Sequence, residues 1–456
     1  MNALLVSALW GVIMMFSGIA IKRPALLRYL AIAGVMVLLG LNTAEMQGWQ
    51  LVDIDTTARL QFDAYAFLLN AILLASVLIY LVLSGSAMER IGPNVSDYLA
   101  LLFFIGAGMM MVTAFESLLI LFLGIEIITI PLYILTGSDK KNLKSNEASL
   151  KYFLLGAFSS GILLMGITLV YGARGSFALS GVADTIRVSS SLMVPGMLLL
   201  LIAMAFKVSA APFHFWTPDV YDGAPTVFTS FMATIVKVAV FAAFLRLFDR
   251  SFALQFNAWQ WWVAILAALT LFVGNITAVF QQSVKRMLSY SSIAQAGFML
   301  LAVFAMNTMA KEGLLLYAAS YSLATIGIFA VLSRMKDYSF EAFNGMAGRY
   351  PWVAAALAIF FLSLAGIPLT GGFMAKFYMI KSALGQSLWL ALFALLMAAV
   401  SVYYYFKVIQ AMYFKPVAQS DPLSFDSGFT GMLLGVAALV IVLGVFPEWL
   451  IACLYF

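Results

Sequence analysis

The sequence predicts an all-α polytopic membrane protein with about fourteen transmembrane helices. Hydrophobic residues make up 64% of the 456 residues and charged residues only 10%, against roughly a half and a quarter in soluble globular chains. Apolar runs of about 20 residues, enough to cross about 30 Å of hydrocarbon, recur along the whole chain. No polar stretch between them is long enough to fold separately. We therefore expect one integral membrane domain over residues 1–456.

Fourteen spans are expected from the apolar runs between polar segments. They lie near residues 4–20, 29–41, 67–83, 98–114, 117–135, 152–171, 192–215, 227–248, 261–280, 287–306, 314–332, 352–382, 388–413 and 431–450. The second of these runs is the weakest. The first has no basic leader before it and no convincing cleavage site after it, so we expect it to remain in the mature protein.

The basic residues of the loops predict the orientation of the chain. With the amino terminus outside, fourteen basic residues fall in inner loops: Lys22, Arg23, Arg28, Arg90, Lys140, Lys141, Lys144, Lys151, Lys285, Arg286, Arg334, Lys336, Arg349 and Lys415. Seven fall in outer loops: Arg59, Arg174, Arg187, Arg246, Arg250, Lys311 and Lys381. Cytoplasmic loops are enriched in Lys and Arg, so both termini are expected on the outer, periplasmic side of a bacterial inner membrane.

Two further features agree with this orientation. The expected outer loop over residues 42–62 carries the acidic residues Glu45, Asp53 and Asp55. The formal charge of +5 comes mostly from the short inner loops. The positive charge therefore reflects how the chain is oriented across the membrane, and we expect no nucleic-acid partner.

Five ionisable residues fall inside expected spans: Glu126, Lys207, Lys237, Lys376 and Lys407. Each costs about 2.5 to 3.5 kcal/mol at the bilayer centre, so such residues are by default functional candidates. Glu126 and Lys237 are expected near mid-membrane, and Lys207 and Lys376 at a similar depth. Lys407 lies closer to the end of its span, where a lysine reaches the interface by snorkelling.

Two interpretations of these residues remain open. In the structural one, they form static ion pairs that pack helices together, or they snorkel. In the functional one, they relay protons: removal from water favours loss of the lysine proton, while a nearby carboxylate favours the charged ammonium. The four lysines outnumber the single glutamate, which favours the relay. Movement of the Glu126 charge relative to Lys207 would then load or unload that lysine.

Two spans carry matching helix breaks. The seventh contains KVSAAPFHFWTPD, and the twelfth contains AGIPLTGGFMAKF; the residues expected to break them are Pro212, Pro368, Gly371 and Gly372. Breaks in membrane helices mark cavities and transport sites, although prolines also kink helices for packing alone. Because the breaks are five spans apart, a repeat with that spacing would have inverted topology.

The remaining candidates are few. His214, the only histidine, and Lys407 are further candidates for a proton path; a hydrogen-bonded structural role is the alternative for His214. Asp219 and Asp222 are expected as solvated helix caps. The tyrosines at 403–405 are expected as interfacial or packing aromatics.

Cofactor chemistry is not expected in this chain. The single cysteine, Cys453, excludes an internal disulfide and a cysteine-ligated metal or iron–sulfur cluster, and one histidine excludes a histidine metal site. No phosphate-binding loop, dinucleotide fingerprint or Ser/His/Asp arrangement on a soluble scaffold is present in the sequence. We expect no catalytic, metal or cofactor-binding residue of those types.

Several long motifs resemble the antiporter-like subunits of respiratory complex I. LGIEIITIPLYIL resembles their glutamate-bearing fifth helix, and FKVSAAPFHFWTPDVYDGAPTVFTSFMATIVKVAVFAAFLRL their seventh and eighth helices. NITAVFQQSVKRMLSYSSIAQAGFML and LAGIPLTGGFMAKF resemble their ninth-to-tenth and twelfth helices. VYDGAP together with a lysine in the eighth helix is similar to the branch called subunit N of NADH-quinone oxidoreductase, or subunit 2 in mitochondria.

The resemblance implies an architecture and residue roles. It implies fourteen helices with inverted repeats over about residues 98–248 and 261–413, flanked by helices over 1–97 and 431–456. By position, Glu126 matches the fifth-helix glutamate, Lys207 the seventh-helix lysine, Lys237 the connecting lysine of the eighth helix and Lys376 the lysine towards the exit. Lys407 matches no role.

The resemblance also implies partners and a reaction. It implies a proton-translocating subunit of NADH-quinone oxidoreductase, beside other membrane subunits and a hydrophilic arm. FMN and iron–sulfur clusters are implied in those partner subunits, with NADH and quinone as substrates of the complex. The alternative is a subunit of a multi-subunit cation/proton antiporter or a membrane-bound hydrogenase. A third alternative is a structural spacer that transports nothing.

Overall fold

The structure, a computed structural model, describes residues 1–49, 51–52, 59–179, 191–417 and 425–455. Asp53, Asp55 and Arg187, used above for orientation, lie outside the described residues. The α-helices are α1 Asn2–Ala20, α2 Pro24–Met46, α3 Ala64–Ser84, α4 Val95–Ala114, α5 Leu118–Thr136, α6 Leu143–Arg174, α7 Met193–Lys207, α8 Trp216–Gly223, α9 Thr226–Phe231, α10 Lys237–Ser251, α11 Phe256–Val279, α12 Val284–Ala305, α13 Thr308–Leu332, α14 Met346–Arg349, α15 Pro351–Ala365, α16 Gly371–Leu384, α17 Leu388–Phe414, α18 Ser427–Val445 and α19 Glu448–Ala452.

The prediction of an all-helical membrane fold is confirmed. Within the described ranges, twelve helical segments are long and apolar enough to cross a membrane. Two shorter apolar helices, α7 and α15, open the two segments expected to be broken. The total of fourteen spans and the inverted repeats stay predictions.

The second expected span was too short. Its helix, α2, has 23 residues and starts at Pro24, where proline suits the first helical position. Glu45 is therefore part of α2 and not of a loop. Its carboxylate accepts hydrogen bonds from the backbone N–H groups of Asn2, at 2.7 Å, and Ala3, at 3.3 Å. Glu45 thus satisfies free donors at the start of α1.

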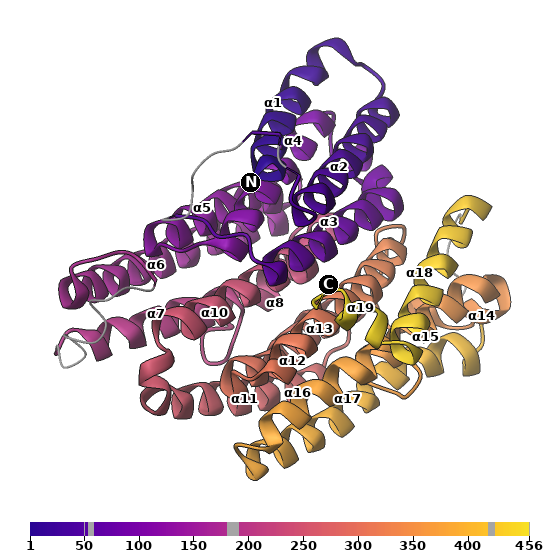
Figure 1. Ribbon diagram of the computed structural model, residues 1–456. Coiled ribbons are helices and arrows are strands. Elements are labelled where there is room, and N and C mark those ends of the chain that lie inside the picture. Colours follow the sequence, from indigo (N-terminus) through magenta and orange to yellow (C-terminus); the bar gives the residue numbers. More distant parts are fainter. Residues whose placement is uncertain (50, 53–58, 180–190, 418–424, 456) are drawn as a thin grey trace.

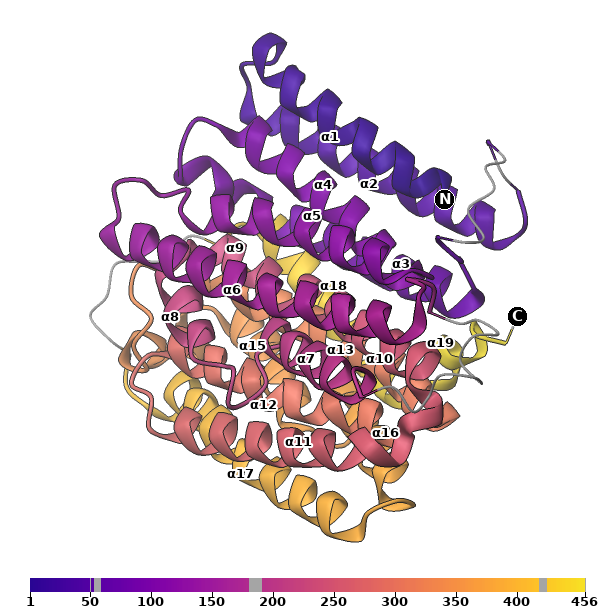
Figure 2. The ribbon, with the colours of Figure 1, turned by 90° about the vertical axis from the view of Figure 1, so that its left-hand side faces the viewer.

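The helices divide into a buried centre and an exposed periphery. The segment Thr226–Ser251, which contains α9 and α10, and helix α13 are entirely buried over their apolar windows, whereas only 22% of that window is buried in α1 and 28% in α18. Figure 1 shows α1–α4 at one end of the molecule and α15, α17 and α18 at the other, with α10, α12 and α13 between them. Figure 2 shows the long helices running in similar directions, with both chain ends at the same end of the bundle.

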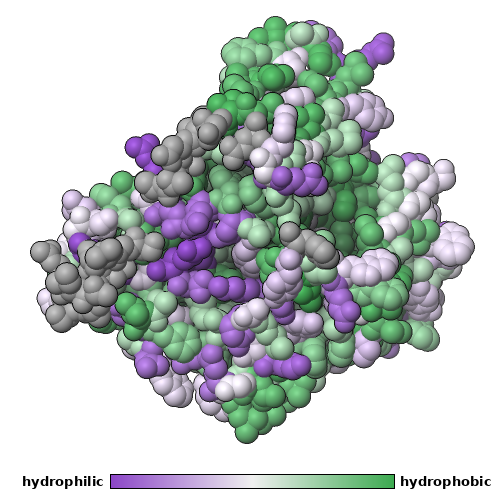
Figure 3. Space-filling view, viewed as in Figure 1, coloured by the Kyte–Doolittle hydropathy of each residue, from purple (hydrophilic) through white to green (hydrophobic). Residues whose placement is uncertain are grey.

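Hydrophilic side chains gather to the left of the middle on the face that carries both chain ends, while much of the rest of this face is hydrophobic (Figure 3). Arg246 was expected in an outer loop, but it lies within α10 and is only 8% exposed. Its guanidinium contacts Asp63 at 2.8 Å and Glu116 at 2.7 Å, and donates to the carbonyl of Phe115 at 2.9 Å. It therefore ties α10 to the starts of α3 and α5.

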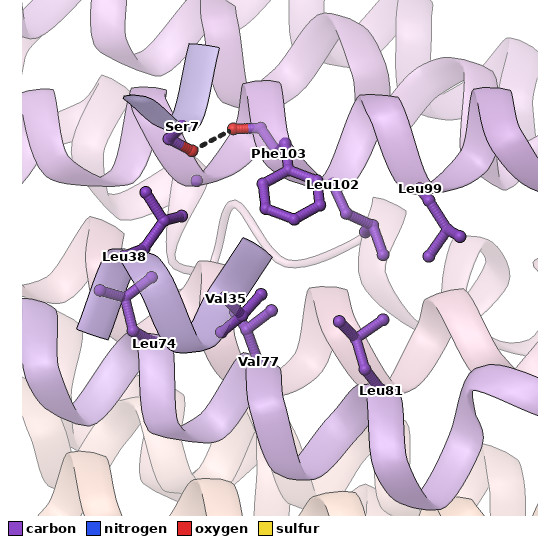
Figure 4. A pocket seen from close by; sticks show the side chains of 10 residues that line it. Ser7, Val35, Leu38, Leu74, Val77, Leu81, Leu99, Leu102 and Phe103 are labelled. Carbon is purple, nitrogen blue, oxygen red and sulfur yellow. Dashed lines mark hydrogen bonds between the residues drawn. The ribbon is translucent and has the colours of Figure 1, made fainter. Parts of the chain in front are cut away.

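The first four helices enclose a small apolar cavity (Figure 4). Side chains from α2, α3 and α4 line it: Val35, Leu38, Leu74, Val77, Leu81, Leu99, Leu102 and Phe103. At ≈ 10 Å³ it has room for about one water molecule. Ser7 adds a hydroxyl at its edge, which donates to the Phe103 carbonyl at 2.8 Å. The first four helices therefore pack tightly against one another, and their interior has little space for a ligand.

Candidate proton-transfer residues

Lys207 is the last residue of α7, directly before the first helix break. Ser209 takes a left-handed conformation with φ of 65°, and the N–H of Ala210 returns to the carbonyl of Ala205 at 2.8 Å. Helix α8 starts only at Trp216, so Pro212 lies in the non-helical segment between the two helices. The break places the Lys207 side chain at a helix end, where carbonyl dipoles favour a positive charge.

Ser160 connects Glu126 to Lys207. The Lys207 ammonium donates to the Ser160 hydroxyl at 3.1 Å, and this hydroxyl donates to Glu126 Oε1 at 2.5 Å. The three residues come from α7, α6 and α5; α6 lies beside the other two (Figure 2). Glu126 and Lys207, both described, form no direct ion pair. The serine thus completes a three-residue chain, and the charged residues of the sequence do not by themselves reveal it.

This group is less buried than the sequence suggested. Glu126 and Lys207 are both partly exposed, and only Ser160 between them is buried. Near Glu126, Ile127 and Ile130 of α5 are exposed. Glu126 therefore lies at the side of the bundle, within reach of whatever covers α5.

Lys237 lies in the interior, 2% exposed. It follows directly on a π-helical turn over Met232–Val236, a distortion that often accompanies functional residues. Its ammonium donates to the Ser292 carbonyl at 2.9 Å and also to the Ser292 hydroxyl. The ring of Tyr221 lies 5.9 Å from the nitrogen. No carboxylate contacts Lys237 among the described residues, so neutral dipoles and a ring hold it.

Lys376 is held by the end of the other broken segment and is 4% exposed. Its ammonium donates to the carbonyls of Leu364, at 2.7 Å, and Ala365, at 3.0 Å, at the carboxyl end of α15. Gly366 closes that helix with φ of 84°. These carbonyls have lost their helical partners, and the positive charge of Lys376 satisfies them.

The two glycines expected to break the twelfth span have a different position. Gly371 and Gly372 are the first residues of α16, and Pro368 is the residue that lies between the helices. A side-chain carbon on Gly372 would lie 1.9 Å from the Ser363 carbonyl oxygen. Glycine is needed there because the backbones of α15 and α16 approach closely.

A cluster of neutral polar side chains lies next to Lys376. Gln295 donates to the Leu364 carbonyl, which also receives Lys376, at 3.1 Å, and to the Tyr405 hydroxyl at 3.0 Å. Tyr317 donates to the Gln295 side-chain oxygen, and Tyr405 is hydrogen-bonded to Ser291. Because α12 also carries Ser292, the partner of Lys237, one helix supplies groups to both lysines. The sequence signal for this cluster is the polar stretch SYSSIAQ within an otherwise apolar helix.

The tyrosines of α17 do not behave alike. Tyr403 is exposed at 62%, as expected of an interfacial aromatic residue, whereas Tyr404 and Tyr405 are fully buried. Tyr404 donates to Asn275 at 3.1 Å, and Tyr405 belongs to the polar cluster. Tyr405 is thus a packing aromatic residue, as expected, and its hydroxyl makes specific hydrogen bonds in addition.

A small cavity of ≈ 10 Å³ lies between this cluster and Lys376. Its lining includes Gln295, Tyr317, Tyr321 and Lys376, and it has room for about one water molecule. Tyr321 donates to the carbonyl of Ala233, in the π-helical turn before Lys237, at 2.8 Å. Polar groups thus follow one another from Lys237 to Lys376.

Aromatic rings separate the Glu126–Ser160–Lys207 group from Lys237. The ring of Trp216 lies 5.7 Å from that of Phe206, the neighbour of Lys207, and 6.0 Å from that of Tyr221, which faces Lys237. No direct hydrogen bond joins Lys207 and Lys237, which are both described. The candidates therefore form two groups, one at the side of the bundle and one in its interior.

His214 lies in the non-helical segment after Lys207 and is partly exposed. Its ring centroid is 4.8 Å from that of Phe215. Its buried Nδ1 has no hydrogen-bond partner in the described part of the chain. The structure does not bring His214 into either group.

Asp219 and Asp222, expected as solvated helix caps, lie within α8, where charged partners surround them. Asp219 pairs with Lys151 at 3.0 Å and with Arg286 at 3.3 Å, and these residues border a cavity of ≈ 220 Å³ that Asp222 also lines. Lys285, counted above as a loop residue, is buried and donates to the carbonyls of Asp222 and Ala224. The capping interpretation thus misses an ion-pair network.

Lys407 lies apart from these groups. Its nitrogen is 4.1 Å from the centroid of the Phe340 ring, and it lines a separate, open cavity. No set of three or more His, Cys, Asp or Glu residues suited to a metal ion occurs in the described part of the chain.

Known proteins are similar to this chain in both sequence and fold. Residues 116–401 match the family described as NADH:quinone oxidoreductase/Mrp antiporter, TM. NADH-quinone oxidoreductase subunit N of Cytophaga hutchinsonii is 39% identical over 459 aligned positions, which cover 99% of each chain. Subunit N of Trichlorobacter lovleyi is also 39% identical, over 85% of this chain and 82% of the relative.

A solved structure of respiratory complex I from Thermus thermophilus contains a similar chain. The TM-score is 0.86 at 30% identity, with 99% of both chains covered. A chain of the Mrp complex from Dietzia shares the fold, with a TM-score of 0.83, at only 18% identity. This chain belongs to the NADH:quinone oxidoreductase/Mrp antiporter transmembrane family.

Proposed function

We propose that this chain is the proton-translocating membrane subunit of a bacterial NADH-quinone oxidoreductase. Electron transfer from NADH to quinone, carried out by FMN and iron–sulfur clusters in partner subunits, would drive proton movement through Glu126, Lys207, Lys237 and Lys376. The observation that carries the proposal is the hydrogen-bonded chain from Glu126 through Ser160 to Lys207. This chain joins the Glu126 carboxylate to the Lys207 ammonium through the Ser160 hydroxyl, which donates one hydrogen bond and accepts the other.

The Glu126–Lys207 group is the loading site in this mechanism. With Glu126 charged and hydrogen-bonded, the ammonium form of Lys207 is favoured; loss of this contact favours proton release. The partial exposure of Glu126 at the side of α5 leaves it open to an electrostatic change in a neighbouring subunit. Moving one charge against 100 mV costs about 2.3 kcal/mol. One or two hydrogen bonds to a charged group, about 1.5 to 3 kcal/mol each, are of that size.

The interior group carries the proton onward. Lys237 and Lys376 are held by carbonyls, hydroxyls and aromatic rings instead of carboxylates. An ammonium held by neutral groups is less firmly fixed in its charged form than one in a buried ion pair. The hydroxyls of Tyr317, Tyr321 and Tyr405 and the amide of Gln295 supply donors and acceptors between the two lysines.

The remaining architecture completes the proposal. Fourteen spans with both termini on the periplasmic side place the charged cavity at Asp219 on the cytoplasmic side, as an entry for protons. Inverted repeats over about residues 98–248 and 261–413 make the breaks after Lys207 and before Lys376 equivalent. Both breaks end a helix with a left-handed residue, Ser209 in one and Gly366 in the other, which supports the equivalence.

The alternative function is transport of a cation in exchange for protons within a multi-subunit antiporter. The fold shared with a chain of the Mrp complex motivates this alternative. The 30% identity with the complex I chain, against 18% with the Mrp chain, favours the oxidoreductase.

Purification with native partners separates the two functions. The tagged chain is extracted gently from its own membrane, its partners are identified, and NADH-quinone reductase activity is measured. Flavin and iron–sulfur subunits with that activity are expected. Antiporter subunits without NADH oxidation would contradict the proposal. Pumping at the parent rate by an assembled Glu126→Ala, Lys207→Ala double variant would contradict the residue roles and favour a structural spacer.

A further inference from the structure

An open cavity lies beside Lys407, along the carboxyl-terminal part of α17. Its volume is ≈ 620 Å³, within the range of about 300 to 1,000 Å³ that is usual for small-molecule sites. Helix α17 and the short segment around Glu341 form its walls. Figures 1 and 2 both place α17 at the edge of the helix bundle, and only 39% of its apolar window is buried.

The charges of the cavity are unbalanced. Lys407 of α17 and Lys415, directly after this helix, line it, and among the described lining residues the one carboxylate is Glu341. No hydrogen bond or ion pair to a described residue satisfies either lysine, and the Lys407 ammonium lies over the face of the Phe340 ring. Lys407 is partly buried, so its ammonium has lost part of its hydration without gaining an anionic partner. Such a group favours binding of a negatively charged ligand.

The surroundings of the cavity are those of a lipid-facing surface. Exposed side chains follow one stripe of α17 toward the cavity: Leu392, Leu396, Tyr403, Phe406 and Phe414. Lys407 is seven residues from the end of α17, about 10 Å along the helix axis. Tyrosine beside lysine at this depth is typical of the boundary between hydrocarbon and headgroups. A soluble anion has no apolar part that would contact the exposed stripe of α17 leading to the lysines.

From these observations we infer that the cavity binds an anionic phospholipid, with its phosphate at Lys407 and Lys415 and an acyl chain along the exposed stripe of α17. Basic pockets between membrane helices on the cytoplasmic side suit such headgroups. This end of α17 has the orientation proposed above for the cytoplasmic side. The site needs only that the helices span a membrane, and it does not depend on proton transfer.

The test is photolabelling of the whole assembled complex in liposomes. Two probes carry a diazirine on the acyl chain next to glycerol: phosphatidylglycerol, which is anionic, and phosphatidylcholine, which is neutral. Labelled peptides over residues 403–414 are quantified by mass spectrometry. We expect phosphatidylglycerol to label this peptide about fivefold more, the factor that one lysine contributes near a membrane surface.

Variants assign the preference to Lys407. Lys407→Gln is expected to lower phosphatidylglycerol labelling most of the way to the phosphatidylcholine level, with the remainder due to Lys415, and Lys407→Arg to retain it. Lys141→Gln, which removes an exposed lysine from an inner loop, is the matched control and is expected to change nothing. If the Lys407→Gln complex does not assemble, Lys415→Gln replaces it, with a partial loss expected.

Three outcomes overturn the inference. Equal labelling by the two probes shows that the cavity has no preference for negative charge. Unchanged labelling of Lys407→Gln, or of Lys415→Gln where that variant stands in, shows that the lysines do not hold the phosphate. Absence of both labels from the peptide shows that another subunit covers this face in the complex.

Discussion

Lys376 and Leu364 are joined across a helix break: the ammonium of Lys376, in α16, donates to the Leu364 carbonyl at the end of α15 at 2.7 Å. The same carbonyl accepts a hydrogen bond from Gln295 of α12 at 3.1 Å. One backbone oxygen thus connects the lysine to the polar cluster. We expect a change in the charge of Lys376 to affect the cluster, because both donors share this one acceptor oxygen.

Replacement of Lys376 by methionine is expected to abolish proton pumping by the assembled complex. The variant keeps the volume of the side chain but leaves the Leu364 and Ala365 carbonyls short of a donor, at a cost of about 1 to 3 kcal/mol per group. Pumping is measured as quenching of a pH-sensitive dye in inverted vesicles during NADH oxidation. Lys381→Met, an exposed lysine on the same helix, is the control and should pump normally. Parent-rate pumping by Lys376→Met would exclude the lysine from the path.

Removal of the Ser160 hydroxyl is expected to uncouple Glu126 from Lys207. Ser160→Ala deletes both hydrogen bonds of the bridge, and loss of one bond to a charged group, worth about 1.5 to 3 kcal/mol, lowers the pumping rate about tenfold or more. Ser160→Thr keeps the hydroxyl and should retain most of the rate.

The neighbour Ser159 provides the control for this experiment. It is fully buried, and its hydroxyl has no hydrogen-bond partner in the described part of the chain. Ser159→Ala should therefore pump at the parent rate. Equal rates for Ser160→Ala and Ser159→Ala, with equal amounts of assembled complex, would show that the bridge plays no part in pumping.

The main charges of the site were predictable from the sequence, and their partners were not. Lys207, Lys237 and Lys376 stand out because charge is rare in apolar helices. Ser160 and Gln295 do not, since neutral polar residues occur in membrane helices for many reasons. Their roles depend on which helices pack together, and that packing is long-range information.

The position of Arg246 shows a second limit. The sequence places it near a span end, where a basic residue usually meets water. In the structure it is buried, because Asp63 and Glu116 from two other helix starts converge on it. Loop charges therefore predict an orientation for the chain, but they do not show which arginine is part of the packed interior.

The Tyr405 hydroxyl is expected to contribute to transfer between Lys237 and Lys376. Tyr405→Phe removes the hydrogen bonds to Ser291 and Gln295 while keeping the ring, so pumping should fall severalfold with little loss of assembly. Tyr413→Phe, on the exposed part of the same helix, is the control. Pumping per NADH oxidised is the measurement. An unchanged ratio in Tyr405→Phe would place the path elsewhere.

Loss of Arg246 is expected to destabilise the protein without any direct effect on proton transfer. Arg246→Met leaves Glu116 buried without its cation, and breaking a buried ion pair in this way costs about 3 to 5 kcal/mol. The complex should unfold at a lower temperature, as followed by the loss of intact complex on native gels after heating. Arg250→Met is the matched control: Arg250 is more exposed and contacts Asp63 at 3.4 Å, so its loss should have little effect. Proton pumping per NADH in the surviving Arg246→Met complex should equal that of the parent. A lower ratio at unchanged stability would instead make Arg246 part of the proton path at the proposed periplasmic face.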